Sequence, residues 1–156
     1  MRRGPRVFLF CVLCARALDL FVEMADIPAK TIVVNHDAPN MATKNMGDGK
    51  AIALVSKFGN LQCMKITFQP EFDWVRDVSP ALPDTPQRCP ATHFGVLTQG
   101  QITISNPDGS STVVNAGDTY LMPPGHLPKC TSKEPSVMVE FSDNTAAVMA
   151  TMSKVK

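Results

Sequence analysis

Three side chains in the second half of the chain, Cys89, His93 and His126, belong to residue types that bind transition metals. A thiolate and two imidazoles form a soft sulfur and nitrogen ligand set, which suits Zn²⁺, Fe²⁺, Ni²⁺ or Cu²⁺. Three protein ligands that leave a fourth position open are typical of a catalytic zinc site. We therefore predict that these residues bind one divalent transition metal. The chain has only one further histidine, His36, so it cannot form a four-histidine site.

The same three residues have a second interpretation, in which no metal is required. Cys89 would then be a small buried apolar residue, and the two histidines would be hydrogen-bonded groups that line a metal-free pocket. Cys89 and His93 are four residues apart, so they share one face if the chain is already extended at Cys89. Pro90 lies between them, at a position compatible with the start or the edge of a strand. The spacing leaves both interpretations open.

Three further residues are candidates for substrate binding, whereas no catalytic residue can be named. Trp74 is the only tryptophan, and it either stacks on a ligand or fills a surface groove. Glu140 lies between Val139 and Phe141, so on a regular strand it points away from both. That direction is either the pocket, where it would accept a proton or bind metal, or solvent, which we favour. For Tyr120, the only tyrosine, the same two directions, pocket or solvent, are open.

The elements that must position these side chains are short β-like runs separated by turn residues. Eight such runs with frequent turns predict an all-β sandwich or barrel. They are Thr31–Val34, Ala51–Ser56, Leu61–Phe68, Thr92–Thr98, Gln101–Ser105, Ser111–Asn115, Thr119–Met122 and Ser136–Phe141. The clearest local signal is the turn Asn106-Pro107-Asp108-Gly109, which predicts a hairpin between two of these runs.

Proline is concentrated in one part of the chain. Five of the 13 prolines fall within residues 70–90, a stretch that therefore cannot be a central strand or a helix interior. We predict a long irregular connection there. Phe72 and Trp74 lie within it, and an aromatic pair needs a surface to cover, so we expect the connection to be ordered against the domain.

Length and composition limit the function classes. The chain has 156 residues, enough for about one domain, and a formal net charge of +1. The balanced charge and the absence of a basic stripe argue against a nucleic-acid partner. The sequence has neither a glycine-rich phosphate loop nor a G-x-S-x-G nucleophile motif. Five cysteines without regular spacing do not form a disulfide framework.

Residues 1–23 are set apart as an N-terminal extension. Their arginines, the short apolar run that ends at Cys14 and an Ala-Arg-Ala triplet are compatible with a secretory signal, an arginine-rich transit peptide, or a physiological start at Met24. A cytoplasmic location follows from the last interpretation, and a secreted or organellar one from the others. The apolar run is too short to span a membrane. Residues 24–143 form the predicted domain, and 144–156 a tail or short helix.

Two motifs point to a known family. Residues 117–125, Gly-Asp-Thr-Tyr-Leu-Met-Pro-Pro-Gly, have the form G-x5-P-x-G, and His126 follows them. Residues 89–100 have the form C-x3-H-x-G-x4-G, with Trp74 upstream. Together these features resemble small single-domain members of the cupin superfamily. The resemblance covers about half of the chain and implies an all-β fold, a cupin-type antiparallel jelly-roll barrel whose mouth holds a metal or a ligand.

The chain departs from the cupin consensus at every ligand position. Cys89 stands where the family has the second histidine of its first motif, and His93 stands where it has a glutamate. His126 lies two residues before the position of the histidine in the second motif. The resemblance still implies metal ligands at these three residues, or at least a pocket that they line.

The resemblance implies two functions of different classes. The first is a metal-dependent cupin enzyme that acts on a small molecule in the barrel lumen by oxygenation, isomerisation or a lyase reaction. The alternative is a non-catalytic cupin that binds or senses a small molecule without metal. A small-molecule ligand and a homodimer formed through an edge strand are expected in both, with neither nucleic acid nor membrane as partner.

Overall fold

The computed structural model describes residues 30–38, 43–58 and 61–141, and all structural statements refer to these residues. They contain nine strands and two short helical turns. The strands are β1 (Thr43–Met46), β2 (Ala51–Phe58), β3 (Leu61–Phe68), β4 (His93–Gln99), β5 (Gln101–Ser105), β6 (Ser111–Asn115), β7 (Thr119–Met122), β8 (Leu127–Lys129) and β9 (Ser136–Glu140). The helical turns are α2 (Trp74–Asp77) and the 3₁₀ turn η2 (Ser79–Ala81).

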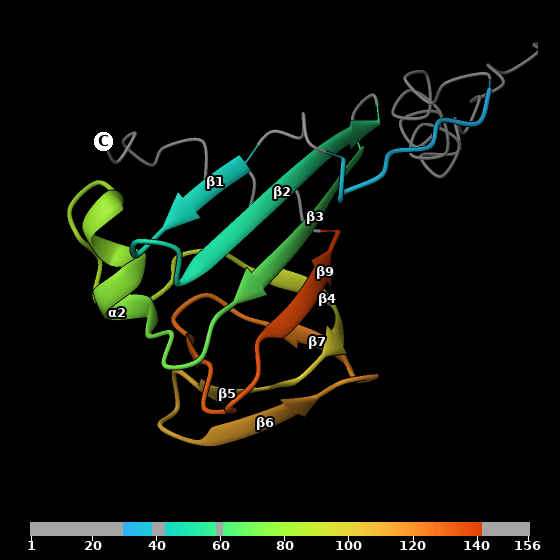
Figure 1. Ribbon diagram of the computed structural model, residues 1–156. Coiled ribbons are helices and arrows are strands. Elements are labelled where there is room, and N and C mark those ends of the chain that lie inside the picture. The colour runs from blue at the N-terminus through green and yellow to red at the C-terminus, as the bar shows by residue number, and fades with distance from the viewer. Residues whose placement is uncertain (1–29, 39–42, 59–60, 142–156) are drawn as a thin grey trace, which may run out of the picture.

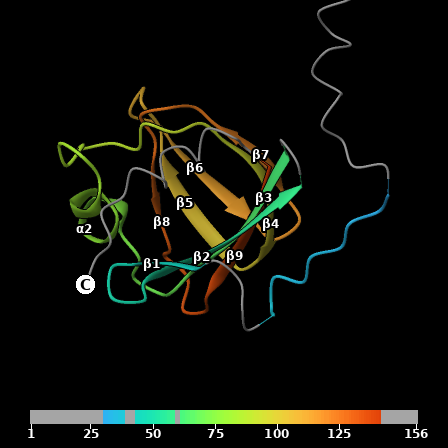
Figure 2. The same ribbon diagram turned by 90° about the horizontal axis from the view of Figure 1, so that it is seen from above.

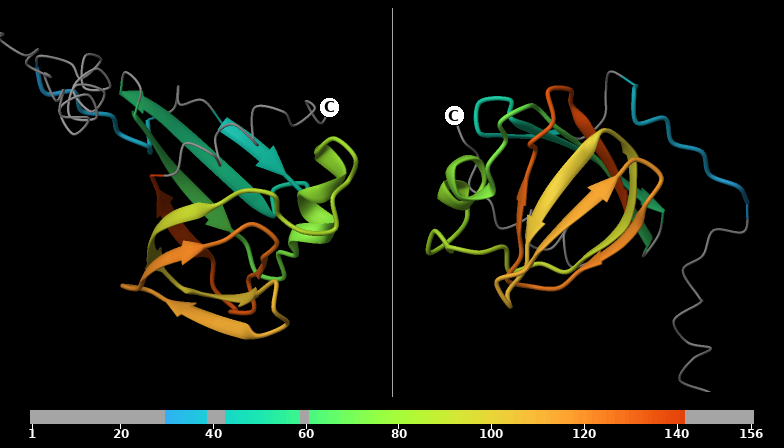
Figure 3. Two further views of the ribbon diagram at one scale, coloured as in Figure 1. Left: turned by 180° about the vertical axis from the view of Figure 1, so that it is seen from behind. Right: turned by 90° about the horizontal axis from the view of Figure 1, so that it is seen from below.

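The strands form two antiparallel sheets. The larger sheet has the order β1-β2-β3-β9-β4-β7, and the smaller has the order β6-β5-β8. Figure 1 shows the long β2–β3 hairpin above the shorter strands, and both views of Figure 3 show β5 and β6 facing the larger sheet. The all-β prediction is therefore confirmed, with the chain crossing repeatedly between two facing layers.

The core lies between the two sheets because each contributes the apolar half of an alternating pattern. In β3, Met64, Ile66 and Phe68 are buried, whereas the residues between them are only partly covered. In β5 of the smaller sheet, Ile102 and Ile104 are likewise buried, and they alternate with less buried residues. This period of two is what a half-buried strand requires. The hairpin predicted around residues 106–109 is present, with β5 pairing to β6 from Gln101↔Asn115 to Ser105↔Ser111.

One predicted strand is wrong, and two strands were not predicted. Residues 31–34 form no strand, and Val33 is 85% exposed, because these β-branched residues find no partner strand. The edge of the larger sheet is formed instead by β1, whose polar sequence Thr-Lys-Asn-Met carries little strand signal. The short strand β8 was also not predicted. It contains Pro128, which an edge strand tolerates because one row of its backbone groups has no ladder partner.

The proline-rich connection is ordered, as expected, but it is not entirely irregular. Asp73 caps the single helical turn α2 by accepting a hydrogen bond from the Val75 amide at 3.0 Å. Pro80 lies at the start of η2, where proline is tolerated. Phe72 and Trp74 are both buried. Seen from above in Figure 2, α2 lies at one end of the molecule near β1 and β8, and so covers that end of the core.

The predictions for residues 1–23 and 144–156 lie outside the described residues. Among the described residues, the helical turns are too short to cross a membrane.

Candidate metal centre and cavity

Cys89, His93 and His126 come together although 37 residues separate the first from the last. Their ligand atoms all lie within 4.8 Å of one another. Cys89 ends the proline-rich connection, His93 begins β4, and His126 follows the turn after β7. The sequence prediction that these three side chains share one location agrees with this geometry, which forms a candidate metal site.

Backbone hydrogen bonds hold the two loop segments of this cluster side by side. The Cys89 amide donates to the His126 carbonyl at 3.2 Å, and the Gly125 amide donates to the Cys89 carbonyl at 2.7 Å. The Arg88 guanidinium donates to the Gly125 carbonyl at 2.8 Å. Gly125 has φ +89°, a conformation that glycine adopts without strain. The Pro-Pro-Gly turn therefore directs His126 toward Cys89.

His126 is fully buried and has one ring nitrogen without a hydrogen-bond partner. Its Nδ1 lies 2.6 Å from the Pro123 carbonyl oxygen. Since a carbonyl oxygen can only accept, Nδ1 carries a proton, and Nε2 is the ring nitrogen left to bind a metal. His126 Nε2 is buried and has no hydrogen-bond partner among the described residues. An unpartnered buried acceptor costs free energy, and a metal ion would use its lone pair.

His93 is oriented by a buried carboxylate. Its Nδ1 lies 2.9 Å from both oxygens of Glu140, and its Nε2 lies 3.4 Å from Cys89 Sγ. Glu140 is only 1% exposed and accepts a second hydrogen bond from the Tyr120 hydroxyl at 3.1 Å. A carboxylate that fixes the far nitrogen of an imidazole directs the near nitrogen at a metal. Glu140 thus points His93 Nε2 at the cluster.

The charges of the cluster stabilise one another. Burial raises the pKa of the Cys89 thiol, but the imidazoles of His126 and His93 outweigh burial and lower that pKa to about 6. Burial lowers the pKa of His93, whereas Cys89 and Glu140 outweigh it and raise that pKa to about 10. Burial and the neighbouring Glu140 raise the pKa of Tyr120 above its usual range, so its hydroxyl stays a donor. Both shifts favour a thiolate beside an imidazolium over the neutral pair when no metal is bound.

Because Gly95 has no side chain, the Tyr120 hydroxyl can reach the Glu140 carboxylate over β4. Gly95 is the register partner of Tyr120 on β7 and of Glu140 on β9, so it lies between them on β4. A Cβ atom at this position would come within 2.8 Å of the Tyr120 hydroxyl and would overlap the Val139 carbonyl oxygen. The hydrogen bond over β4 therefore requires glycine at residue 95.

A cavity of about 50 Å³ lies against the cluster, and His93, His126 and Glu140 form part of its wall. Nine of its twelve lining residues are apolar. Trp74 is one of these nine, together with Phe72 and Val78 from the same connection. The connection between β3 and β4 therefore supplies part of the wall.

Structural comparison identifies the fold. A cupin-superfamily sugar phosphate isomerase from Silicibacter pomeroyi aligns with 70% of this chain and 82% of its own, at 11% identity and a TM-score of 0.50. The chain has a cupin fold. A protein of unknown function from Acinetobacter aligns with 71% of the cupin-fold chain and 98% of its own, at 14% identity and a TM-score of 0.50. Apo-HppE aligns with 74% of this chain and 60% of its own, at 9% identity and a TM-score of 0.51.

Comparison of the sequence itself finds no matching protein-family model and no matching curated protein. The expected jelly-roll arrangement of antiparallel strands is confirmed by the two facing sheets and by the structural match. Because the structural relatives share so few residues, they establish the cupin fold of this chain and nothing about its substrate.

The three residues predicted to bind substrate have different positions in this cupin fold. Trp74 and Glu140 line the cavity, whereas Tyr120 is not among the lining residues and contacts Glu140 instead. The preference for a solvent-facing Glu140 is wrong, because its side chain is buried. Sequence reasoning also missed Gly95, whose importance appears only once β7, β4 and β9 are known to be neighbours.

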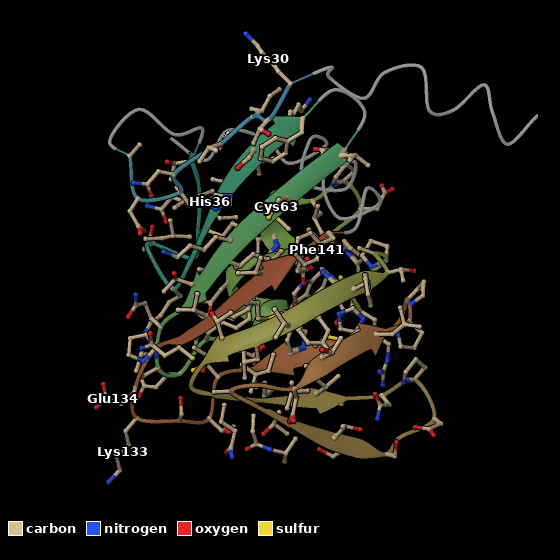
Figure 4. All side chains as sticks on the ribbon, turned by 90° about the vertical axis from the view of Figure 1, so that its right-hand side faces the viewer. Lys30, His36, Cys63, Lys133, Glu134 and Phe141 are labelled. Carbon is tan, nitrogen blue, oxygen red and sulfur yellow. The ribbon has the colours of Figure 1, made fainter. Side chains whose placement is uncertain are left out.

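The remaining histidine lies apart from the cluster. His36 Nε2 lies 2.6 Å from the Ser56 hydroxyl of β2. Figure 4 shows His36 and Cys63 beside the β2–β3 hairpin. Among the described residues, Cys89, His93 and His126 form the only cluster of three or more potential metal ligands.

Proposed function

We propose that this cupin-fold protein binds one divalent transition metal through Cys89 Sγ, His93 Nε2 and His126 Nε2, and that it is a metal-dependent enzyme for a small molecule. The observation that carries the proposal is the buried His126 Nε2, which has no hydrogen-bond partner in the described part of the chain and lies within 4.8 Å of a thiol and a second imidazole. A tetrahedral ion bound to three such donors keeps one position open. The donor set therefore fits a metal.

The donor types narrow the choice of ion. Thiolate and imidazole favour Zn²⁺, Fe²⁺, Ni²⁺ or copper, whereas Mg²⁺ and Ca²⁺ prefer oxygen ligands. A metal bound there would act as a Lewis acid toward a molecule held beside it. Glu140 would keep His93 in its metal-binding tautomer by accepting a hydrogen bond from Nδ1, and the Pro123 carbonyl would do the same for His126.

The cavity supports an activity on a molecule held next to the cluster. His93 and His126 line it, so a ligand in the cavity would lie beside the donor atoms. The apolar residues of the wall would exclude water from this position. The proposed reaction is an oxygenation, an isomerisation or a lyase reaction, and the acceptor of any proton released there would be Glu140 or the Cys89 thiolate.

Elemental analysis of the protein purified without chelators tests the proposal. We expect about one transition metal ion per chain in the wild type. The variants Cys89→Ser, His93→Ala and His126→Ala should retain less than a tenth of that metal. Substoichiometric metal in the wild type, or undiminished metal in His126→Ala, would contradict the proposal.

Two matched variants control for the loss of any cysteine or histidine. Cys63→Ser and His36→Ala change the same residue types on or next to the β2–β3 hairpin, outside the cluster (Figure 4). Both should keep the wild-type metal content. Replacing Cys89 should also remove the thiolate-to-metal charge-transfer band of the Co²⁺-substituted protein, whereas replacing Cys63 should leave it unchanged. A metal-free wild type that still binds a small molecule would instead support the binding or sensor function.

A further inference from the structure

The titratable groups in the cavity wall have no hydrogen left to donate into the cavity once a metal is bound. The three titratable lining residues are His93, His126 and Glu140, and the indole of Trp74 is the other N–H side chain in the wall. The Nδ1 hydrogen of His93 is directed to Glu140, and that of His126 to the Pro123 carbonyl. With both Nε2 atoms on a metal, neither ring donates into the cavity. Glu140 as a carboxylate can only accept.

The charges around the cavity also provide no excess positive charge. No lysine or arginine is among its lining residues in the described part of the chain. A carboxylate or phosphate ester would therefore enter a mostly apolar, desolvated site with no lysine or arginine in its described wall to pair with. Burying such an unpaired charge is costly.

The size of the cavity limits its occupant as strongly as the polarity does. The volume is about 50 Å³. For comparison, an engineered apolar cavity of about 150 Å³ holds one benzene molecule or xenon. The space next to the cluster therefore fits a molecule smaller than benzene.

The geometry points to a neutral, weakly polar ligand of this size as the occupant of the cavity, with carboxylates and phosphate esters excluded. Dioxygen and nitric oxide belong to this class by size and polarity. The role of that ligand as a reactant rests on the metal site proposed above. Its binding to the apolar wall does not, because the wall is built from side chains that need no metal to fold.

Methionine methyl groups provide a direct test. Met46, Met122 and Met138 line the cavity, whereas Met64 is buried but is not a lining residue. With ¹³C-methyl-labelled methionine, dissolved xenon should shift the three lining methyl signals saturably and leave Met64 in place. Sodium acetate and inorganic phosphate at millimolar concentrations should shift none of them. The same pattern is expected in metal-loaded and in chelator-treated protein.

Two variants of the wall complete the test. Val78→Phe should fill the cavity and abolish the xenon-induced shifts. Met138→Ala enlarges the space instead, and its remaining lining signals, Met46 and Met122, should respond to benzene, which should not bind the wild type. Saturable shifts with acetate, or none with xenon, would overturn the inference. Xenon shifts in a wild type that binds no added transition metal would refute only the metal site, and metal binding without xenon shifts would refute only the cavity ligand.

Discussion

The Tyr120 hydroxyl donates a hydrogen bond to Glu140 over the intervening strand β4, at a distance of 3.1 Å. The hydrogen bond passes over Gly95, the register partner of both residues. Because Glu140 also accepts from His93 Nδ1, the phenol, the carboxylate and the imidazole form one buried chain of hydrogen bonds. The orientation of a candidate metal ligand thus depends on a glycine two residues away from it.

Gly95→Ala should be among the most destabilising single-methyl additions in this protein. The new Cβ would overlap the Val139 carbonyl oxygen and crowd the Tyr120 hydroxyl, so β4 and β9 would have to separate. We expect a loss of about 3 kcal/mol or more in the free energy of unfolding, measured by urea denaturation. The control is Gly109→Ala, where nothing lies within 4 Å and only the φ of +86° is strained, at about 1–2 kcal/mol. Equal losses in both variants would refute this account.

Tyr120→Phe removes the hydroxyl and leaves one Glu140 oxygen with a single donor. A hydrogen bond to a charged buried group contributes about 1.5–3 kcal/mol, so the unfolding free energy should fall by that amount. The control is Thr103→Val, which removes an exposed hydrogen bond between the Thr103 and Thr131 hydroxyls. It should change the unfolding free energy by less than about 0.5 kcal/mol. The prediction fails if the phenylalanine variant is as stable as the wild type.

Glu140→Gln keeps the size of the side chain but removes its charge. The amide would still be able to accept from His93 through its oxygen, but it would hold the imidazole less strongly. Loss of such an outer partner weakens metal binding about 10- to 100-fold, which competition with a chromophoric chelator would measure. Glu134→Gln is the matched control, since Glu134 is exposed in the loop between β8 and β9 (Figure 4). Unchanged affinity in Glu140→Gln would show that Glu140 has no influence on the metal.

An exposed apolar surface lies at the β7 edge of the larger sheet. Leu121 on β7 is 70% exposed and pairs in register with Phe94 on β4, which is 49% exposed. The Phe141 amide donates to the Phe94 carbonyl, and its side chain is also exposed. A second copy of the chain would cover this edge, so we expect a homodimer in sedimentation velocity experiments.

Leu121→Glu should convert that dimer to a monomer, because it places a charge in the apolar contact. Val113→Glu introduces the same charge at an apolar position on β6 that is 50% exposed, and it should leave the sedimentation coefficient unchanged. A wild type that sediments as a monomer at all concentrations would exclude this interface.

The sequence predicted best those strands whose signal is local. β3, β5, β6 and β7 have the predicted bounds because alternation and turn residues mark them without reference to a partner. Residues 31–34 have strong β-propensity but no strand to pair with, and β1 has a partner but little propensity. Strand pairing is a property of the folded chain, so neither error was visible in the sequence.

The candidate ligands could be found from residue type and motif spacing, but their supporting residues could not. Glu140 was ambiguous because β9 has apolar residues on both sides, with Ser136, Met138 and Glu140 buried and the valines between them partly buried. Such a strand has no polar face from which its orientation can be inferred. The cavity likewise combines residues from strands, loops and α2, so only the folded structure shows its size.

The connection between β3 and β4 carries both the wall and a donor. Phe72, Trp74 and Val78 line the cavity, Cys89 lies near the end of the same segment, and His93 begins the strand that follows. A local opening of this segment would remove part of the wall and displace the thiolate in a single event. Release of a bound metal and escape of a bound ligand would then share one kinetic barrier, set by how firmly Trp74 is packed.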